Sequence, residues 1–175
     1  MTAPDPRPSS DLALRLTMDT FITLYWRRHL LDETTGQLRD LDHHVVELDA
    51  ARWTTLAAMH RDIAAALDFP GYYGHNLDAL NDCLGDVACD GGYTDTPHRA
   101  GLVLSLTNYD HFTTIEPESA QIVLDIIAGQ ARRATVLGRR MICLVHSNDP
   151  DIRFEPVGAT PVMWNHAEWL DSNRQ

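Results

Sequence analysis

Six aspartates fall between residues 68 and 95, in a stretch that contains no lysine or arginine. Three of them, Asp78, Asp82 and Asp86, repeat every four residues, so a helix would place them on one face. Carboxylates in this arrangement can bind the cationic groups of a partner molecule. The alternative interpretation is a solvated helix face with no partner.

Two tyrosines, Tyr72 and Tyr73, precede this acidic stripe, in a segment that continues through Gly74 to Asn76. Tyrosine is enriched at protein–protein contact surfaces, where its ring supplies both apolar area and a polar tip. Adjacent tyrosines usually separate, so that one ring packs beneath the helix and the other stays exposed. Residues 72–86 are therefore our candidate partner-binding surface.

Three apolar runs predict the strands that support this surface, at residues 45–48, 102–106 and 141–145. The last two are almost continuously apolar, which is typical of central strands covered on both faces in a parallel sheet. We therefore predict an α/β fold with a small, mostly parallel sheet of about three core strands packed with helices.

Apolar periodicity predicts three helices between these strands. The first follows a cap at Asp49, and the second follows a cap at Asn76 and ends at Gly85 or at residues 91–92. The third extends over residues 117–138, with proline in its first turn and glycine at its end. The acidic stripe lies on the second of these helices, opposite its leucines.

The chain is expected to form one compact domain, with a core at residues 45–146 and extensions at 1–44 and 147–175. A length of 175 residues can bury enough apolar surface to need no disulfide or metal. In the first extension, residues 21–26 predict a strand and residues 30–41 a helix.

The second extension contains Trp164 and Trp169. We expect a short helix capped near Asn165 in this extension, with both tryptophans packed onto the body of the domain.

The overall charge restricts the kinds of partner. There are 25 acidic residues against 14 basic ones, all of them arginine, and the net charge is −11. This charge disfavours a nucleic acid, and no apolar run approaches the roughly 20 residues of a membrane helix. Three cysteines at irregular spacings and a polar, proline-rich start predict a cytoplasmic protein without disulfides.

Catalytic motifs are missing from the sequence. The nine histidines do not form a His-x-x-x-His pattern, and neither a Gly-rich phosphate loop nor a nucleophile elbow occurs. We predict no catalytic residues, metal site, cofactor or small-molecule substrate. The enzyme alternative is a hydrolase that uses Cys83 or Cys143 with His146.

Residues 69–84, Phe-Pro-Gly-Tyr-Tyr-Gly-His-Asn-Leu-Asp-Ala-Leu-Asn-Asp-Cys-Leu, resemble the signature loop and helix of the barstar family of intracellular ribonuclease inhibitors. The predicted order of strands and helices over residues 45–145 is similar to the whole barstar fold. The resemblance implies a non-enzymatic inhibitor or immunity protein, whose acidic helix enters the active site of a basic ribonuclease or toxin and imitates the substrate phosphate.

The resemblance also implies roles for individual residues. Asp82 would occupy the centre of the partner's active site, and Asp78 would bind a flanking cation. Tyr72 would cover the neighbourhood of the catalytic histidine, while Gly74 and Asn76 would shape the backbone contacts of the loop.

Several positions depart from the family pattern. Asn81 and Val87 stand where barstar has tryptophans, and Gly129 stands where it has a further glutamate, with Asp125 the nearest acid. These differences leave open a barstar-like scaffold that binds some other basic protein. The candidate partner-binding residues are Tyr72, Tyr73, Gly74, Asn76, Asp78, Asn81, Asp82 and Asp86.

Overall fold

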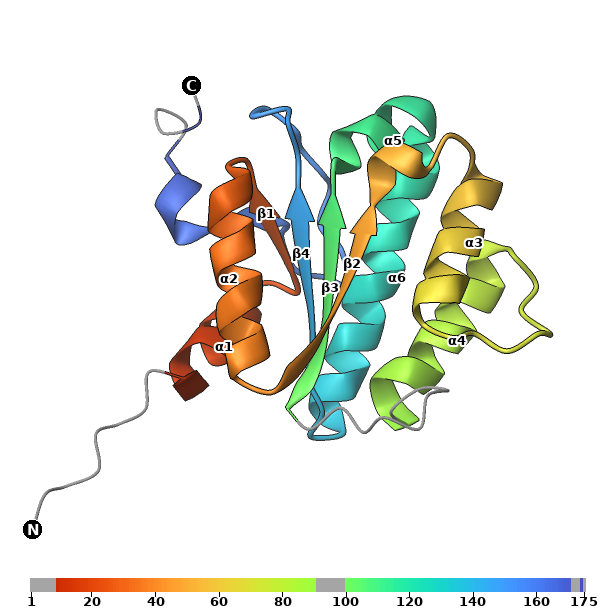
Figure 1. The fold of residues 1–175 in the computed structure, drawn as a ribbon, viewed down its shortest axis with the longest axis horizontal. Helices are drawn as coiled ribbons and strands as arrows, with labels where there is room; N and C mark the ends of the chain where they lie inside the picture. The colour runs from red at the N-terminus through yellow and green to blue at the C-terminus, as the bar shows by residue number, and fades with distance from the viewer. Residues whose placement is uncertain (1–8, 91–99, 171–173, 175) are drawn as a thin grey trace, which may run out of the picture.

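The computed structural model describes residues 9–90, 100–170 and 174, and its centre is a parallel β-sheet (Figure 1). The sheet has five strands in the order β2-β3-β4-β1-β5. The strands are Ile22–Tyr25 (β1), His43–Asp49 (β2), Gly101–Thr107 (β3), Met141–His146 (β4) and Met163–Trp164 (β5). The predicted α/β class is confirmed, but the sheet is larger than the three strands predicted.

The helices lie on both faces of the sheet (Figure 1). They are Ser9–Met18 (α1), Arg28–Asp40 (α2), Leu56–Ala66 (α3), Leu77–Asp90 (α4), Tyr109–Ile115 (α5) and Pro117–Val136 (α6). Short 3-10 helices occur at Ala50–Arg52 and His166–Glu168. Helices α1 and α2 cover one face, and α3 to α6 cover the other.

Two hydrophobic clusters explain why the central strands are apolar throughout. Successive side chains of a strand point to opposite faces of the sheet. In β3, Leu102 and Leu104 belong to the larger cluster, which contains the buried residues of α3 to α6. Val103, between them, belongs to the smaller cluster with Ala13 of α1 and Leu31 of α2. The sequence therefore needs apolar residues at every position of β3.

The two additional strands come from the extensions of the chain. Strand β1 lies between β4 and β5, with Leu24 opposite Val145 on one side and Trp164 on the other. The strand predicted at residues 21–26 thus acquires a place in the sheet. Strand β5 was not predicted, because two residues are too few to show an alternating pattern.

One helix boundary differs from the predicted one, and a second falls next to one of two predicted ends. Asp49 caps the 3-10 helix, accepting a hydrogen bond from Ala51 N at 3.1 Å, whereas α3 is capped by Thr55, whose Oγ1 accepts from Ala58 N at 3.1 Å. Helix α4 continues through Gly85 to Asp90, which adjoins the second of its two predicted ends, at residues 91–92. Gly85 is a place of close approach to α6 rather than a stop, because a Cβ there would meet side-chain atoms of α6 at 3.2 Å.

The C-terminal extension contains a 3-10 turn where a short helix was predicted. Asn165 caps the turn by accepting a hydrogen bond from Ala167 N at 2.9 Å. Trp164 packs beneath Arg174, whose guanidinium carbon lies 4.4 Å from the ring centre. Trp169 is 55% exposed, so the prediction that both tryptophans pack onto the body is wrong for Trp169.

A fully buried carboxylate joins this extension to the rest of the domain. Glu168 accepts hydrogen bonds from Trp26 N at 3.0 Å and Arg27 N at 2.7 Å, at the end of β1 and the start of α2. Its backbone oxygen accepts from Arg174 Nη1 at 2.8 Å. Segments 141 and 142 residues apart in the chain are thereby held together.

Candidate partner-binding surface

Helix α4 has one buried face and one acidic face. Leu80 and Leu84 are 0% and 1% exposed and pack into the larger hydrophobic cluster. Asp78, Asp82 and Asp86 are all exposed. The arrangement predicted from the four-residue repeat is therefore present: one side of the helix anchors it to the domain, and the other presents three carboxylates to solvent.

Local charges do not neutralise the first two of these carboxylates. Within the described ranges, neither Asp78 nor Asp82 takes part in an ion pair. Asp78 lies in the first turn of α4, where the helix dipole stabilises a negative charge. Asp82 lies one turn further on, beyond most of that effect, and next to a like charge. Asp82 therefore gains more than Asp78 from a cation supplied by a partner.

The loop before α4 is held by the side chain of Asn76. Its Oδ1 accepts a hydrogen bond from Ala79 N at 2.8 Å, and its Nδ2 donates to Gly74 O at 3.4 Å. His75, between them, has a positive φ of 50°. The helix cap predicted at Asn76 is confirmed, and the same side chain holds the turn that precedes the acidic face.

The two tyrosines separate as predicted. Tyr72 is 79% exposed, whereas Tyr73 is 6% exposed, with its ring centre 5.0 Å from that of Phe69. The Tyr73 hydroxyl is hydrogen-bonded to Nδ1 of the buried His60 at 2.5 Å. The Tyr73 ring therefore belongs to the core beneath the loop, which leaves little of it for a contact surface. Tyr72 remains on the surface.

Asn81, in the middle of the exposed face, is held by a residue that the sequence analysis missed. The buried Gln130 of α6 donates from Nε2 to Asn81 Oδ1 at 2.8 Å and to Asn81 O at 3.1 Å. Arg133 lies one turn further along α6, with Nη1 3.2 Å from the position of a Cβ at Gly85. Helix α6 thus contributes an amide and a cation beside α4, close to Gly129, the position at which the chain departs from the family pattern.

The buried histidines predict a loss of stability in mild acid. Burial lowers the pKa of His43, His60 and His146 below the ordinary value of 6.5. The unfolded chain therefore binds more protons than the folded one once the pH falls below about 6.5, and the free energy of unfolding decreases by at most about 1.4 kcal/mol per pH unit for each histidine. Urea unfolding at pH 7.5 and pH 5.5 measures this change.

His60→Gln provides the comparison for that measurement, since glutamine does not titrate. The variant is expected to lose less stability than the parent chain between the two pH values. An equal loss in both proteins would mean that His60 does not contribute to the pH dependence.

The cysteine–histidine pair considered for a hydrolase lacks the features of a nucleophilic site. Cys143 is fully buried in β4, and burial raises the pKa of its thiol well above the usual range. His146 is also buried, and its Nδ1 accepts a hydrogen bond from Asn108 N at 3.3 Å. Cys83 is buried on the inner side of α4. These thiols have the surroundings of packing residues.

Residues 9–90, 100–170 and 174 contain neither a group of metal ligands nor a membrane-spanning helix. In these residues, no three or more His, Cys, Asp or Glu side chains are grouped so that they could hold a metal ion. None of the helices in these ranges combines the length and the apolar character needed to cross a membrane. The acidic face of α4 with its loop is therefore the strongest candidate site in the part of the chain that is described.

Comparison with known proteins adds an independent observation. The sequence profile of the family described as Barstar (barnase inhibitor) matches residues 43–146, which include the loop, α4 and α6. YrdF of Bacillus subtilis (strain 168), provisionally named as a ribonuclease inhibitor, is 38% identical over 80 residues. That match covers 46% of this chain and 77% of YrdF. With the parallel sheet and helix order of this core, the match shows that the chain belongs to the barstar family.

Proposed function

We propose that this protein is an inhibitor, of the immunity-protein type, that binds a basic ribonuclease or a related toxin. In this proposal the acidic face of α4 enters the active site of the enzyme. The carboxylates of Asp78 and Asp82 then bind cations that otherwise hold the substrate phosphate. Inhibition results because the RNA and the inhibitor compete for the same charged groups, and the protein itself catalyses no reaction.

One observation carries this proposal. Asp78 and Asp82 are exposed, on a helix whose other face is anchored in the core, and neither has an ion pair within the described residues. Tyr72, in the loop that leads into this helix, has 79% of its surface exposed. Unpaired carboxylates on a helix that follows a loop with an exposed aromatic ring are suited to a basic partner, whose charge also accelerates association at low salt.

The proposed contact residues are accordingly those of the exposed face and its loop. They are Tyr72, Gly74, Asn76, Asp78, Asn81, Asp82 and Asp86. Asp82 has the central place, since it lies in the middle of the row. Asp86 is included because it lies on the same face one turn further on.

A different basic protein is the second candidate partner. Two residues favour this alternative. Asn81 lies on the exposed face of α4 and is neutral, and Arg133 of α6 lies beside it and is positively charged. A partner that contacts both Asn81 and Arg133 would place a hydrogen-bond acceptor or a carboxylate opposite α6. Loss of enzyme activity in the partner distinguishes the two candidates, whereas salt dependence of binding does not.

We place this function in the cytoplasm. Cys83, Cys89 and Cys143 are all free thiols and all buried, which suits a reducing compartment. An inhibitor in the same compartment as cellular RNA would protect that RNA from the ribonuclease.

Titration of the full chain against a barnase-class ribonuclease, with RNA cleavage as the readout, tests the proposed function. The expected result is a loss of cleavage that is complete at a one-to-one ratio of the two proteins. Unchanged cleavage at a large excess of the chain would reject this class of partner and favour the second candidate.

A further inference from the structure

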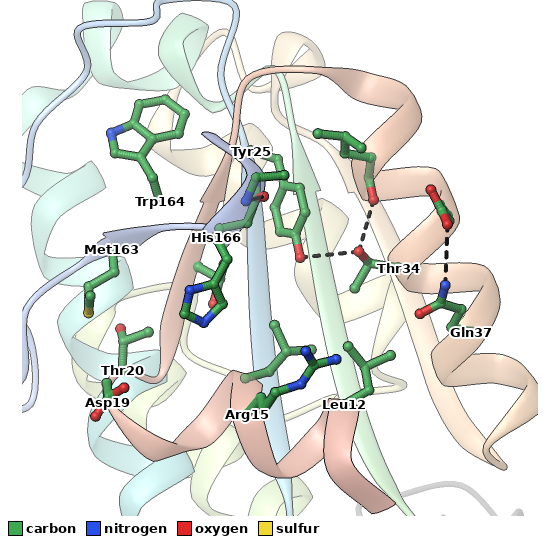
Figure 2. A pocket seen from close by; sticks show the side chains of 16 residues that line it. Leu12, Arg15, Asp19, Thr20, Tyr25, Thr34, Gln37, Met163, Trp164 and His166 are labelled. Atoms are coloured by element: carbon green, nitrogen blue, oxygen red, sulfur yellow. Dashed lines mark hydrogen bonds between the residues drawn. The ribbon is translucent and has the colours of Figure 1, made fainter. Parts of the chain in front are cut away.

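A second candidate site lies on the other side of the sheet from α4. A pocket of about 270 Å³ opens between α1, α2, β1, β5 and the 3-10 helix at His166–Glu168 (Figure 2). Its lining residues fall within 12–37 and 163–167, wholly outside residues 43–146 that match the family. The two extensions of the chain therefore build this pocket together, and the proposed inhibitor function makes no use of it.

The floor of the pocket is formed by the side chains of β1 that point away from α6. Thr23 and Tyr25 are 5% and 2% exposed. The Tyr25 hydroxyl donates to Thr34 Oγ1 at 3.2 Å, and this threonine donates to Leu30 O at 2.8 Å. Burial raises the pKa of Tyr25 to about 12, so the phenol stays neutral. The floor is thus polar but uncharged, and the Tyr25 and Thr34 hydroxyls already donate within the protein.

Apolar side chains make up most of the walls. Leu12 and Leu16 of α1 and Leu30 of α2 pack against the smaller hydrophobic cluster and leave part of their surface toward the pocket. Met163 of β5, which pairs with Thr23 of the floor, closes the opposite side. A cavity of roughly 150 Å³ holds a benzene molecule, so this pocket has space for one ring with a short polar group. The ligand body is therefore small and apolar.

The charged groups lie at the mouth. Arg15 of α1 and His166 reach into the space between α1 and the C-terminal segment (Figure 2). Two carboxylates also line the pocket. Asp19 lies beside Thr20, just after α1. Glu33 of α2 accepts a hydrogen bond at Oε1 from Gln37 Nε2 at 3.4 Å. These two carboxylates disfavour a ligand with several negative charges, such as a nucleotide.

We propose that this pocket binds a small monocarboxylate with an apolar body, held by its carboxylate at Arg15. A guanidinium has five N–H donors in a planar fork, so it can keep contacts within the protein and still donate two hydrogen bonds to a carboxylate. Such charge-assisted, bidentate pairs are stronger than hydrogen bonds between neutral groups. The apolar body lies against Leu12, Leu16 and Met163, above the neutral hydroxyls of the floor.

Three probes of similar shape and different charge test this proposal: phenylacetate, phenylacetamide and 2-phenylethylamine. Each is titrated into the full ¹⁵N-labelled chain, and the backbone amide shifts of Thr23, Thr34 and Ala167 are followed. We expect saturable shifts at these amides with phenylacetate and an affinity about tenfold lower for phenylacetamide, because the amide lacks the charge. The amine is expected to bind no better than the amide.

Two variants in the pocket locate the binding. Arg15→Gln should lower the affinity for phenylacetate about tenfold, to that of phenylacetamide, while leaving the affinity for phenylacetamide unchanged. Ala167→Trp adds a large side chain at an exposed position of the lining and should abolish binding of both probes. Arg132→Gln, which changes an exposed arginine of α6, should leave both affinities as they are.

Several outcomes would overturn the proposal. It fails when no probe causes a saturable shift, when the acid and the amide bind equally, or when the amine binds best. It also fails when Arg132→Gln and Arg15→Gln have the same effect. Far-ultraviolet circular dichroism of each variant, compared with the parent chain, separates loss of binding from loss of folding.

Discussion

Replacing Asp82 with alanine is expected to weaken inhibition of a barnase-class ribonuclease about 30- to 5,000-fold, equivalent to about 2 to 5 kcal/mol of binding free energy. The Asp82 carboxylate is exposed in the middle of the acidic face and has no ion pair in the described part of the chain. In the proposed complex it loses its water and gains cations of the enzyme. Its removal leaves those cations buried and unpaired.

Asp90→Ala is the matched control, because Asp90 is an exposed aspartate in the last turn of the same helix and lies outside the proposed contact set. Its inhibition constant should change at most about fivefold. Neither substitution removes a buried contact, so both variants should keep the free energy of unfolding within about 0.5 kcal/mol. Equal losses of inhibition in the two variants would reject the central place of Asp82.

Replacing Glu168 with alanine is expected to lower the free energy of unfolding by about 2 to 4 kcal/mol. The substitution removes the acceptor of two backbone N–H groups, those of Trp26 and Arg27. Glu168 is 0% exposed, so water cannot easily replace it. The start of α2 and the C-terminal extension should both become less stable. Urea unfolding followed by circular dichroism measures the loss.

Glu155→Ala provides the comparison for Glu168, since Glu155 is an exposed glutamate of the same extension and its side chain forms no hydrogen bond within the described residues. It should change the free energy of unfolding by less than about 0.5 kcal/mol. Below its unfolding temperature, the Glu168→Ala variant should still inhibit the ribonuclease, because α4 and α2 pack on opposite faces of the sheet. A stable Glu168→Ala variant would show that this carboxylate does not hold the extension.

Much of the candidate surface could be predicted because its information is local. The four-residue spacing of Asp78, Asp82 and Asp86 places them on one face of any helix. The cap at Asn76 depends on residues three positions apart. The apolar runs of β3 and β4 indicated central strands, because a strand buried on both faces needs apolar residues throughout. Helix periodicity, capping and strand burial are all set by neighbours in the chain.

The sequence predicted the presence of helices better than the residues at which they begin and end. Gly85 was a plausible helix end from its intrinsic propensity, yet α4 continues past it, and a Cβ there would come within 3.2 Å of the Gln130 and Arg133 side chains of α6. Asp49 was a plausible cap for α3, but a 3-10 turn intervenes. In both cases the competing choices differ by about 1 kcal/mol locally, and tertiary contacts decide between them.

The sequence by itself determined the α/β class and the helix that carries the acidic face. It also determined that one ring of the Tyr72–Tyr73 pair packs in the core. Only the tertiary structure decided that this ring is Tyr73, that Gln130 holds Asn81, and that β1 and β5 extend the sheet and build a pocket. These features join residues 13 to 140 positions apart. No local pattern encodes such pairs, because each member is stabilised only when the folded chain brings its partner to it.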